Sequence, residues 1–119
     1  MSSASKTTTA ARRADRLGPV DLSRMRRPPT HPGEIFNEEF LKPTEVSQAQ
    51  AAYCMGMSAN RLNEIIGGKR SVTAETAVLF AAYTDTDPRF WLRLQVEHDL
   101  WHALRETDVS MIARRSSRT

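Results

Sequence analysis

The sequence has few of the residues that mark several common classes of protein. Its single cysteine, Cys54, excludes an internal disulfide and a zinc site built on cysteines, and it suits a reducing compartment. It has only five glycines and no glycine-rich phosphate loop. No apolar run approaches the roughly 18 residues that span a bilayer. We therefore expect a cytoplasmic protein with a small core and no membrane association.

Arrangements of catalytic residues are also missing, because no Ser/His/Asp set or pair of carboxylates has a readable spacing. We expect no enzymatic activity and no cofactor. His31 precedes Pro32, which favours a role at the start of a helix. His98 and His102 are four residues apart and can bridge a metal on a helix, but no third ligand is evident and packing is the favoured interpretation.

The charge is distributed unevenly along the chain. Residues 1–30 hold seven basic and two acidic residues, and residues 111–119 add three arginines. Residues 31–110 hold seven basic and twelve acidic residues, so the centre of the chain is acidic. The overall charge therefore does not indicate DNA binding, and the acidic centre also suits a basic protein partner.

Three regions are predicted: a flexible basic N-terminal arm at 1–29, a helical DNA-binding and dimerisation domain at 30–108, and a basic C-terminal tail at 109–119. The arm lacks apolar periodicity and ends in Pro28-Pro29. It is either a solubilising tail or an arm that contacts phosphates or the minor groove.

Capping signals predict five helices, no strand and hence an all-α fold. The helices are expected to begin near Thr30, Ser47, Ser58, Thr73 and Asp87-Pro88, and the first three to end near Pro43, Gly56 and Gly67. The expected inward-facing residues of the second to fourth helices are Ala49, Ala52, Met55, Leu62, Ile65, Ile66, Ala77, Val78, Phe80 and Ala81.

The second and third helices, joined by a tight turn at Gly56, are typical of a helix-turn-helix. Short polar side chains at the start of the third helix suit a reader of the major groove. Ser58 and Ala59 are small enough for the helix to approach the bases closely, and Ala59 can contact a thymine methyl group. Asn60 can pair with adenine, and Arg61 can reach guanine or a phosphate. Glu64 either accepts a hydrogen bond from cytosine or is a solvated charge.

Contacts to the DNA backbone are expected from two other places. Ser47 and Gln48 lie at the N-terminus of the second helix, where free N–H groups favour an anion. Lys69 and Arg70 follow the third helix, where a loop can lie along the phosphates. The last helix has more apolar surface than a small bundle needs, which predicts a dimer interface. The residues of that interface are expected to be Phe90, Trp91, Leu94, Leu100, Trp101 and Leu104.

Several motifs follow one another at the spacing of one known family. They are His31-Pro32-Gly33-Glu34-Ile35, Ser47-Gln48-Ala49, Gly56-Met57-Ser58, Arg61-Leu62-Asn63-Glu64-Ile65, Gly68-Lys69-Arg70, Thr73-Ala74-Glu75-Thr76-Ala77, Phe90-Trp91-Leu92, Leu94-Gln95 and Asp99-Leu100. Over about residues 30–106 the chain resembles the HigA-type antitoxins of bacterial toxin–antitoxin modules, within the Xre/Cro-like, or lambda repressor-like, helix-turn-helix group.

The resemblance implies a homodimer that binds double-stranded operator DNA in its own promoter, represses its operon and neutralises a RelE/HigB-like mRNA-cleaving toxin. It implies association with the nucleoid when DNA is bound. Ala51 stands where the family usually has a larger aliphatic residue, and the basic N-terminal extension is not shared. Two alternatives remain, namely an orphan Xre-family regulator without a toxin and a protein-interaction module that no longer reads DNA.

Overall fold

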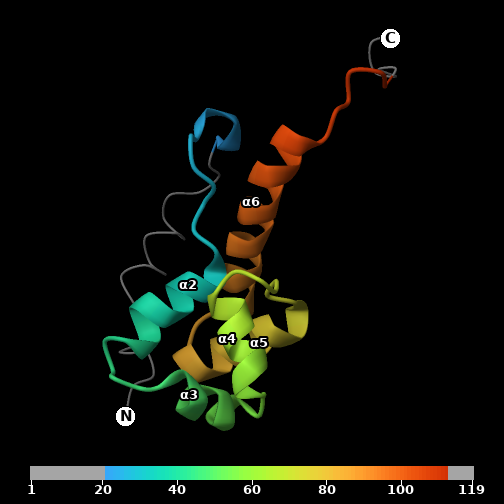
Figure 1. Ribbon diagram of the computed structural model, residues 1–119. Coiled ribbons are helices and arrows are strands. Elements are labelled where there is room, and N and C mark those ends of the chain that lie inside the picture. Colours follow the sequence, from blue (N-terminus) through green and yellow to red (C-terminus); the bar gives the residue numbers. More distant parts are fainter. Residues whose placement is uncertain (1–20, 113–119) are drawn as a thin grey trace.

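The computed structural model describes residues 21–112, and these residues form an assembly of helices without a strand (Figure 1). The elements are the 3-10 turn η2 (Leu22–Arg24), α2 (Pro32–Phe36) with its π-helical continuation η3 (Asn37–Leu41), α3 (Gln48–Met55), α4 (Ala59–Ile66), α5 (Ala74–Thr84) and α6 (Pro88–Glu106). The predictions of an all-α fold and of five helices are confirmed. Residues 1–20 and 113–119 lie outside the described residues. The predictions of a flexible conformation for most of the N-terminal arm, and of a basic C-terminal tail, fall mainly on these residues.

The capping residues read from the sequence are present. Ser47 and Gln50 form a reciprocal capping box at the start of α3, with the Gln50 N–H donating to Ser47 Oγ at 3.1 Å. Ser58, Thr73 and Asp87 each accept a hydrogen bond from the first turn of the helix that follows. These side chains satisfy N–H groups that the helices themselves leave free, and so they fix where each helix begins.

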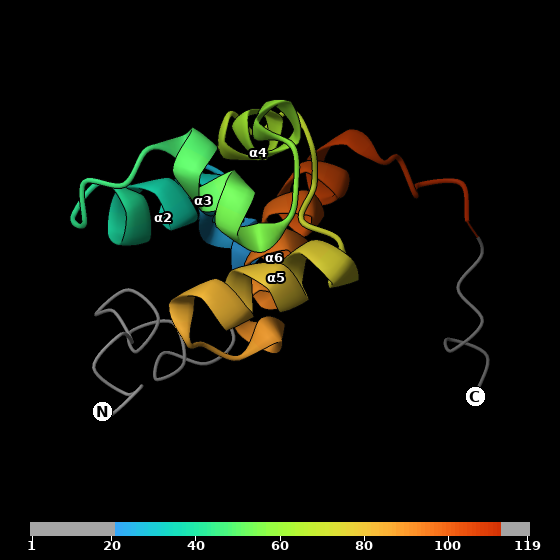
Figure 2. The same cartoon turned by 90° about the horizontal axis from the view of Figure 1, so that it is seen from below.

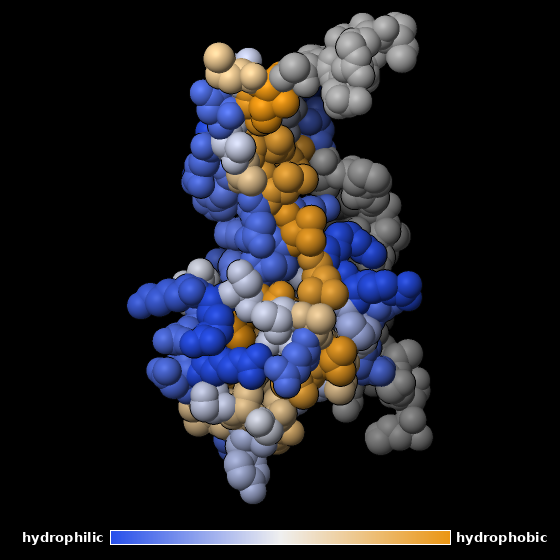
Figure 3. All heavy atoms as spheres, turned by 90° about the vertical axis from the view of Figure 1, so that its right-hand side faces the viewer, coloured by the Kyte–Doolittle hydropathy of each residue, from blue (hydrophilic) through white to orange (hydrophobic). Residues whose placement is uncertain are grey.

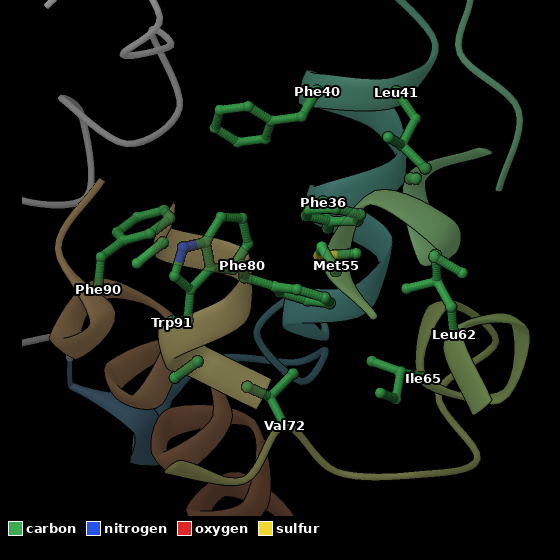
Figure 4. Close-up of a cluster of buried hydrophobic side chains, with 14 residues drawn as sticks. Phe36, Phe40, Leu41, Met55, Leu62, Ile65, Val72, Phe80, Phe90 and Trp91 are labelled. Carbon is green, nitrogen blue, oxygen red and sulfur yellow. The ribbon is translucent and has the colours of Figure 1, made fainter. Parts of the chain in front are cut away.

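Aromatic side chains from α2, α5 and α6 form the centre of the core (Figure 4). The rings of Phe36 and Phe80 stack with their centroids 4.0 Å apart, and Trp91 meets Phe80 edge-on at 5.2 Å. Trp91 is fully buried, and its indole N–H donates to Thr86 Oγ1 at 2.8 Å, so the burial leaves no unpaired donor. This cluster fixes the long helix α6 against the rest of the domain.

Two of the expected inward-facing residues are exposed. In α3 the buried alanines are Ala51 and Ala52, whereas Ala49 faces solvent. In α5 the side chain of Val78 is 55% exposed, because it lies one position past the buried Ala77 and therefore about 100° around the helix. The fully buried Ala51 permits α3 to approach the core closely.

Gly33 brings the start of α2 directly against the end of α4. A Cβ atom at Gly33 would lie 2.0 Å from the carbonyl oxygen of Ile65, so only glycine fits there. Figure 2 shows α4 at the outer edge of the assembly, where one of its faces is not covered by another helix. No helix among residues 21–112 is long and apolar enough to cross a membrane.

The segment that precedes α2 lies against α6. Leu22 is 7% exposed, and the indole N–H of Trp101 donates to the Met25 carbonyl at 3.0 Å. Nδ1 of His98 lies 2.7 Å from the Pro29 carbonyl oxygen. Part of the segment that the sequence assigns to a flexible arm is thus held on the last helix.

Candidate nucleic-acid interface

A three-residue connection joins α3 to α4 in the form of a helix-turn-helix. Gly56 ends α3 with a positive φ of 72°, which glycine adopts without strain, and the Met57 N–H then donates to the Ala52 carbonyl at 3.0 Å. The connection ends at Ser58, whose Oγ accepts from the Arg61 N–H at 3.0 Å. The turn therefore fixes the direction in which α4 leaves α3.

One side of α4 is fastened to the core and the other is open. Leu62 and Ile65 are fully buried, whereas Ala59, Asn60 and Asn63 are exposed. The Asn60 amide makes no hydrogen bond to another residue within 21–112, so its donor and acceptor are available to a ligand. A helix with short polar side chains on its open face and an apolar opposite face has the form that the major groove admits.

Arg61 lies differently from its neighbours. Its side chain is 30% exposed and turns toward the start of α5, where Nη2 donates to Thr76 Oγ1 at 3.0 Å and lies 3.4 Å from Glu75 Oε1. The predicted contact of Arg61 with guanine or phosphate remains a prediction. The sequence did not indicate that Glu75 and Thr76 are partners of Arg61, because partners on another helix give no local signal.

Two other residues predicted to contact DNA are paired with each other. Arg70 donates from Nε and Nη2 to a single carboxylate oxygen of Glu64, at 3.0 and 2.7 Å. Both side chains are partly exposed, so the pair lies at the surface beside the open face of α4. Glu64 thus holds Arg70 against the helix, and it neutralises a cation that phosphates would otherwise attract.

The remaining residues predicted to contact the DNA backbone lie at opposite ends of the helix pair α3 and α4. Ser47 uses its hydroxyl in the capping box, and Gln48 is half-buried in the first turn of α3. Lys69 is exposed, and its ammonium group has no partner among residues 21–112. The Lys69 N–H donates to the Glu64 carbonyl at 2.9 Å, with Gly68 at a positive φ of 78°, so this turn fixes the position of the lysine.

Known proteins show the same fold and related sequences. No family model matches the chain. Virulence-associated protein I of Dichelobacter nodosus is 41% identical over 73 residues, which are 61% of this chain and 68% of that protein. Antitoxin HigA-1 of Vibrio cholerae is 34% identical over 80 residues, which are 67% of this chain and 75% of that protein.

A solved structure extends the similarity to three dimensions. The antitoxin HigA of Pseudomonas aeruginosa, solved with the higBA promoter, has a TM-score of 0.63 and 33% identity, and the match covers 71% of this chain and 99% of that one. The chain belongs to the HigA-type antitoxin family. This confirms the resemblance read from the motifs, and it places the chain in the Xre/Cro-like helix-turn-helix group.

The dimer surface predicted for this HigA-type chain needs correction. Phe90 and Trp91 are 2% and 0% exposed in the single chain, so they belong to its own core and cannot reach a second subunit. Leu94 is half-buried against the same core, and Trp101 is turned toward Met25. The spacing of apolar residues along a helix does not by itself distinguish a core from an interface.

An exposed apolar stripe nevertheless runs along α6, as the orange band in Figure 3 shows. It consists of Val96, Leu100 and Leu104, which are 59%, 45% and 55% exposed and follow one another at four-residue spacing. Val96 was missed in the sequence because it lies between charged and polar neighbours. Leu100 and Leu104 are the residues of the predicted interface that remain exposed.

The histidines of this HigA-type chain have local packing partners. His31 Nδ1 accepts from the Gly33 N–H at 3.0 Å and so caps α2, as the sequence predicts. Burial lowers the pKa of His31, and the neighbouring His98 acts in the same direction while Asp99 opposes it. His98 and His102 meet edge-on, and residues 21–112 hold no group of three potential metal ligands.

Proposed function

We propose that this HigA-type chain binds operator DNA in its own promoter as a homodimer, represses its operon and neutralises a RelE-like mRNA-cleaving toxin. The observation that supports this most is the open face of α4, where Asn60 is exposed and has no hydrogen-bond partner within residues 21–112, while Leu62 and Ile65 anchor the helix. Proteins of the family supply the context, since a relative of known structure was solved with its promoter.

In this proposal α4 enters the major groove with its N-terminus toward the bases. The Asn60 amide pairs with N6 and N7 of an adenine, and Ala59 lies against a thymine methyl group. Ser47 and Gln48 contact a phosphate at the N-terminus of α3, and Lys69 contacts another beyond α4. The contacts to the DNA backbone determine the affinity and its salt dependence, and the α4 residues determine which base sequence is preferred.

The acidic side chains near α4 support sequence-specific rather than general binding. Glu64 pairs with Arg70, and Glu75 lies beside Arg61, so two of the cations at this surface are already compensated. General attraction to phosphates is thereby weakened, while the Asn60 contact is unaffected. The ratio of specific to non-specific affinity rises as a result.

The apolar stripe of α6 supports the homodimer. Val96, Leu100 and Leu104 form a row that a second copy of the same helix can cover. A two-fold axis at this helix would present two copies of α4 to one face of the duplex, with half-sites about 34–36 Å apart. The operator is therefore expected to be palindromic.

The toxin partner is supported by family membership and by charge. Residues 31–110 hold five more acidic than basic residues, which suits a basic ribonuclease. The cell compartment that follows is the bacterial cytoplasm, with association to the nucleoid while DNA is bound.

The test is a fluorescence titration of the full-length protein against the duplex from upstream of its gene and against a shuffled duplex of equal composition. The proposal predicts at least about 10³-fold tighter binding to the upstream duplex at physiological salt. Equal binding to both duplexes would refute it and favour a protein-interaction module. Copurification with the product of the adjacent reading frame tests the toxin, and specific DNA binding without such a partner would indicate an orphan regulator.

A further inference from the structure

Residues 22–29 form a strap that is bound along α6. Its backbone carbonyls are the attachment points: Met25 accepts from Trp101 Nε1 at 3.0 Å and from Arg105 Nη2 at 2.7 Å, and Leu22 accepts from Arg105 Nη2 at 3.4 Å. The Arg105 guanidinium also lies 3.9 Å from the centre of the Trp101 ring. These contacts hold the strap in one position on the helix.

The strap carries three exposed arginines. Arg24 lies 3.4 Å from the carboxylate of Asp21, whereas the side chains of Arg26 and Arg27 have no partner among residues 21–112. Residues 31–110 have a net negative charge, so two unpaired cations side by side stand out against the rest of the described surface. Unpaired, exposed guanidinium groups are well suited to phosphate, which they can bind with two parallel hydrogen bonds.

The strap also brings Arg27 close to the loop that follows α4. Arg27 lines a surface pocket together with Thr30, His31, Glu34, Gly67 and Gly68. Gly67 and Gly68 come directly before Lys69, the exposed cation proposed to contact a phosphate. The two glycines add no side chains to this pocket, and among the described residues Glu34 is its one acidic lining residue.

We propose that the strap is a second DNA-binding element, in which Arg26 and Arg27 bind phosphates of the duplex that flanks the helix-turn-helix site. The inference rests on the proposed function and assigns a phosphate contact to residues 22–29, the end of the arm whose role the sequence leaves open. The favoured occupant is duplex DNA because the strap adjoins the phosphate-contacting turn of α4. Its attachment by Trp101 and Arg105 means that little backbone conformational entropy is lost when the cations bind.

The test compares Arg26→Ala/Arg27→Ala with wild type on an operator duplex extended by about ten base pairs on each side. Each lost phosphate contact lowers the slope of log affinity against log salt by about 0.9. The double variant should therefore lose nearly two units of slope per subunit, while its preference among operator sequences is unchanged. On a duplex trimmed to the operator, wild type and variant should differ much less.

The control variant is Lys42→Ala/Arg89→Ala, which removes the same charge from exposed cations that pair with Glu38 and Asp87. It should keep the wild-type slope within about half a unit. A slope unchanged in the double variant, or an equal loss in the control, overturns the inference. The inference is also overturned if the strap variant keeps the wild-type salt slope for DNA but no longer copurifies with the product of the adjacent gene, since the strap would then bind protein.

The same titrations on a shuffled duplex separate this inference from the proposed function. If wild type lacks sequence preference but the strap variant still loses slope, the proposed operator function fails and the strap contact stands. If wild type is specific and the strap variant matches it, the strap contact fails and the operator function stands. Absence of binding to any duplex at low salt contradicts both.

Discussion

Arg70 and Glu64 form an ion pair beside the open face of α4, in which two guanidinium nitrogens meet one carboxylate oxygen at 2.7 and 3.0 Å. The pair competes with any phosphate that approaches Arg70. It therefore links the general affinity for DNA to a single carboxylate on the recognition helix.

The Glu64→Gln variant is expected to bind shuffled DNA more tightly than wild type. Removing the carboxylate charge frees Arg70 for one phosphate, so the salt slope should steepen by about one unit per subunit. Fluorescence anisotropy at several salt concentrations measures both quantities. Glu38→Gln is the control, because it breaks a comparable exposed pair between Glu38 on η3 and Lys42 directly after it. A similar gain in that variant would contradict the explanation.

The Gly33→Ala variant is expected to be destabilised by about 1–3 kcal/mol, since the added methyl group overlaps the Ile65 carbonyl and the backbones must separate. Urea unfolding followed by circular dichroism gives the free energy of unfolding. Gly67→Ala is the matched control, because its Cβ would lie 3.4 Å from the Asn63 carbonyl oxygen and its φ is −78°. If both variants are equally stable, α2 does not pack on α4 as described.

Protonation of His31 is expected to destabilise the domain. The pKa of His31 is lowered in the folded state, so the stabilising contribution is complete above the unfolded value of 6.5 and is lost as the pH falls through the folded value. The acceptor of the cap is Nδ1, which a proton would occupy. Melting temperatures of wild type should therefore fall between about pH 7.5 and pH 5.

His31→Asn replaces the nitrogen acceptor Nδ1 with an amide oxygen that does not titrate, so the melting temperature of the variant should vary less over the same range. The control is His102→Gln, which removes a partly exposed histidine of α6 that lies 3.7 Å from Glu106. A pH dependence that persists in His31→Asn would assign the effect to another group.

The Leu100→Glu variant is expected to be a folded monomer, because the charge falls in the centre of the apolar stripe and would be buried against the partner. Sedimentation velocity gives the mass and circular dichroism the helix content. Val78→Glu makes the same kind of change at a residue of similar exposure on α5, and it should leave the dimer intact. A wild-type mass for Leu100→Glu would exclude the stripe as the interface.

The parts of the fold that could be predicted are those encoded locally. The caps at Ser47, Ser58 and Thr73 and the left-handed turn at Gly56 depend on residues within one helical turn, so their positions follow from the sequence. The same holds for the buried side of α4, where Leu62 and Ile65 alternate clearly with polar residues.

The parts that could not be predicted depend on contacts between distant segments. Trp101 and Met25 are 76 positions apart, and no local pattern indicates that an indole will cover a strap. In α3 the buried Ala51 and the exposed Ala49 are the same residue type, so composition cannot distinguish them. At the candidate site, Asn60 was readable as an exposed polar residue, whereas the turn of Arg61 toward Thr76 required the position of α5.

Whether α4 reads DNA is tested by a base-pair substitution scan of the operator with wild type and Asn60→Ala. The variant should keep its fold, since Asn60 is exposed, lose about 1–3 kcal/mol of binding free energy, and become indifferent to the base at one position per half-site. A variant that weakens equally on every sequence, with the base preferences of wild type intact, would contradict the claim that α4 reads DNA.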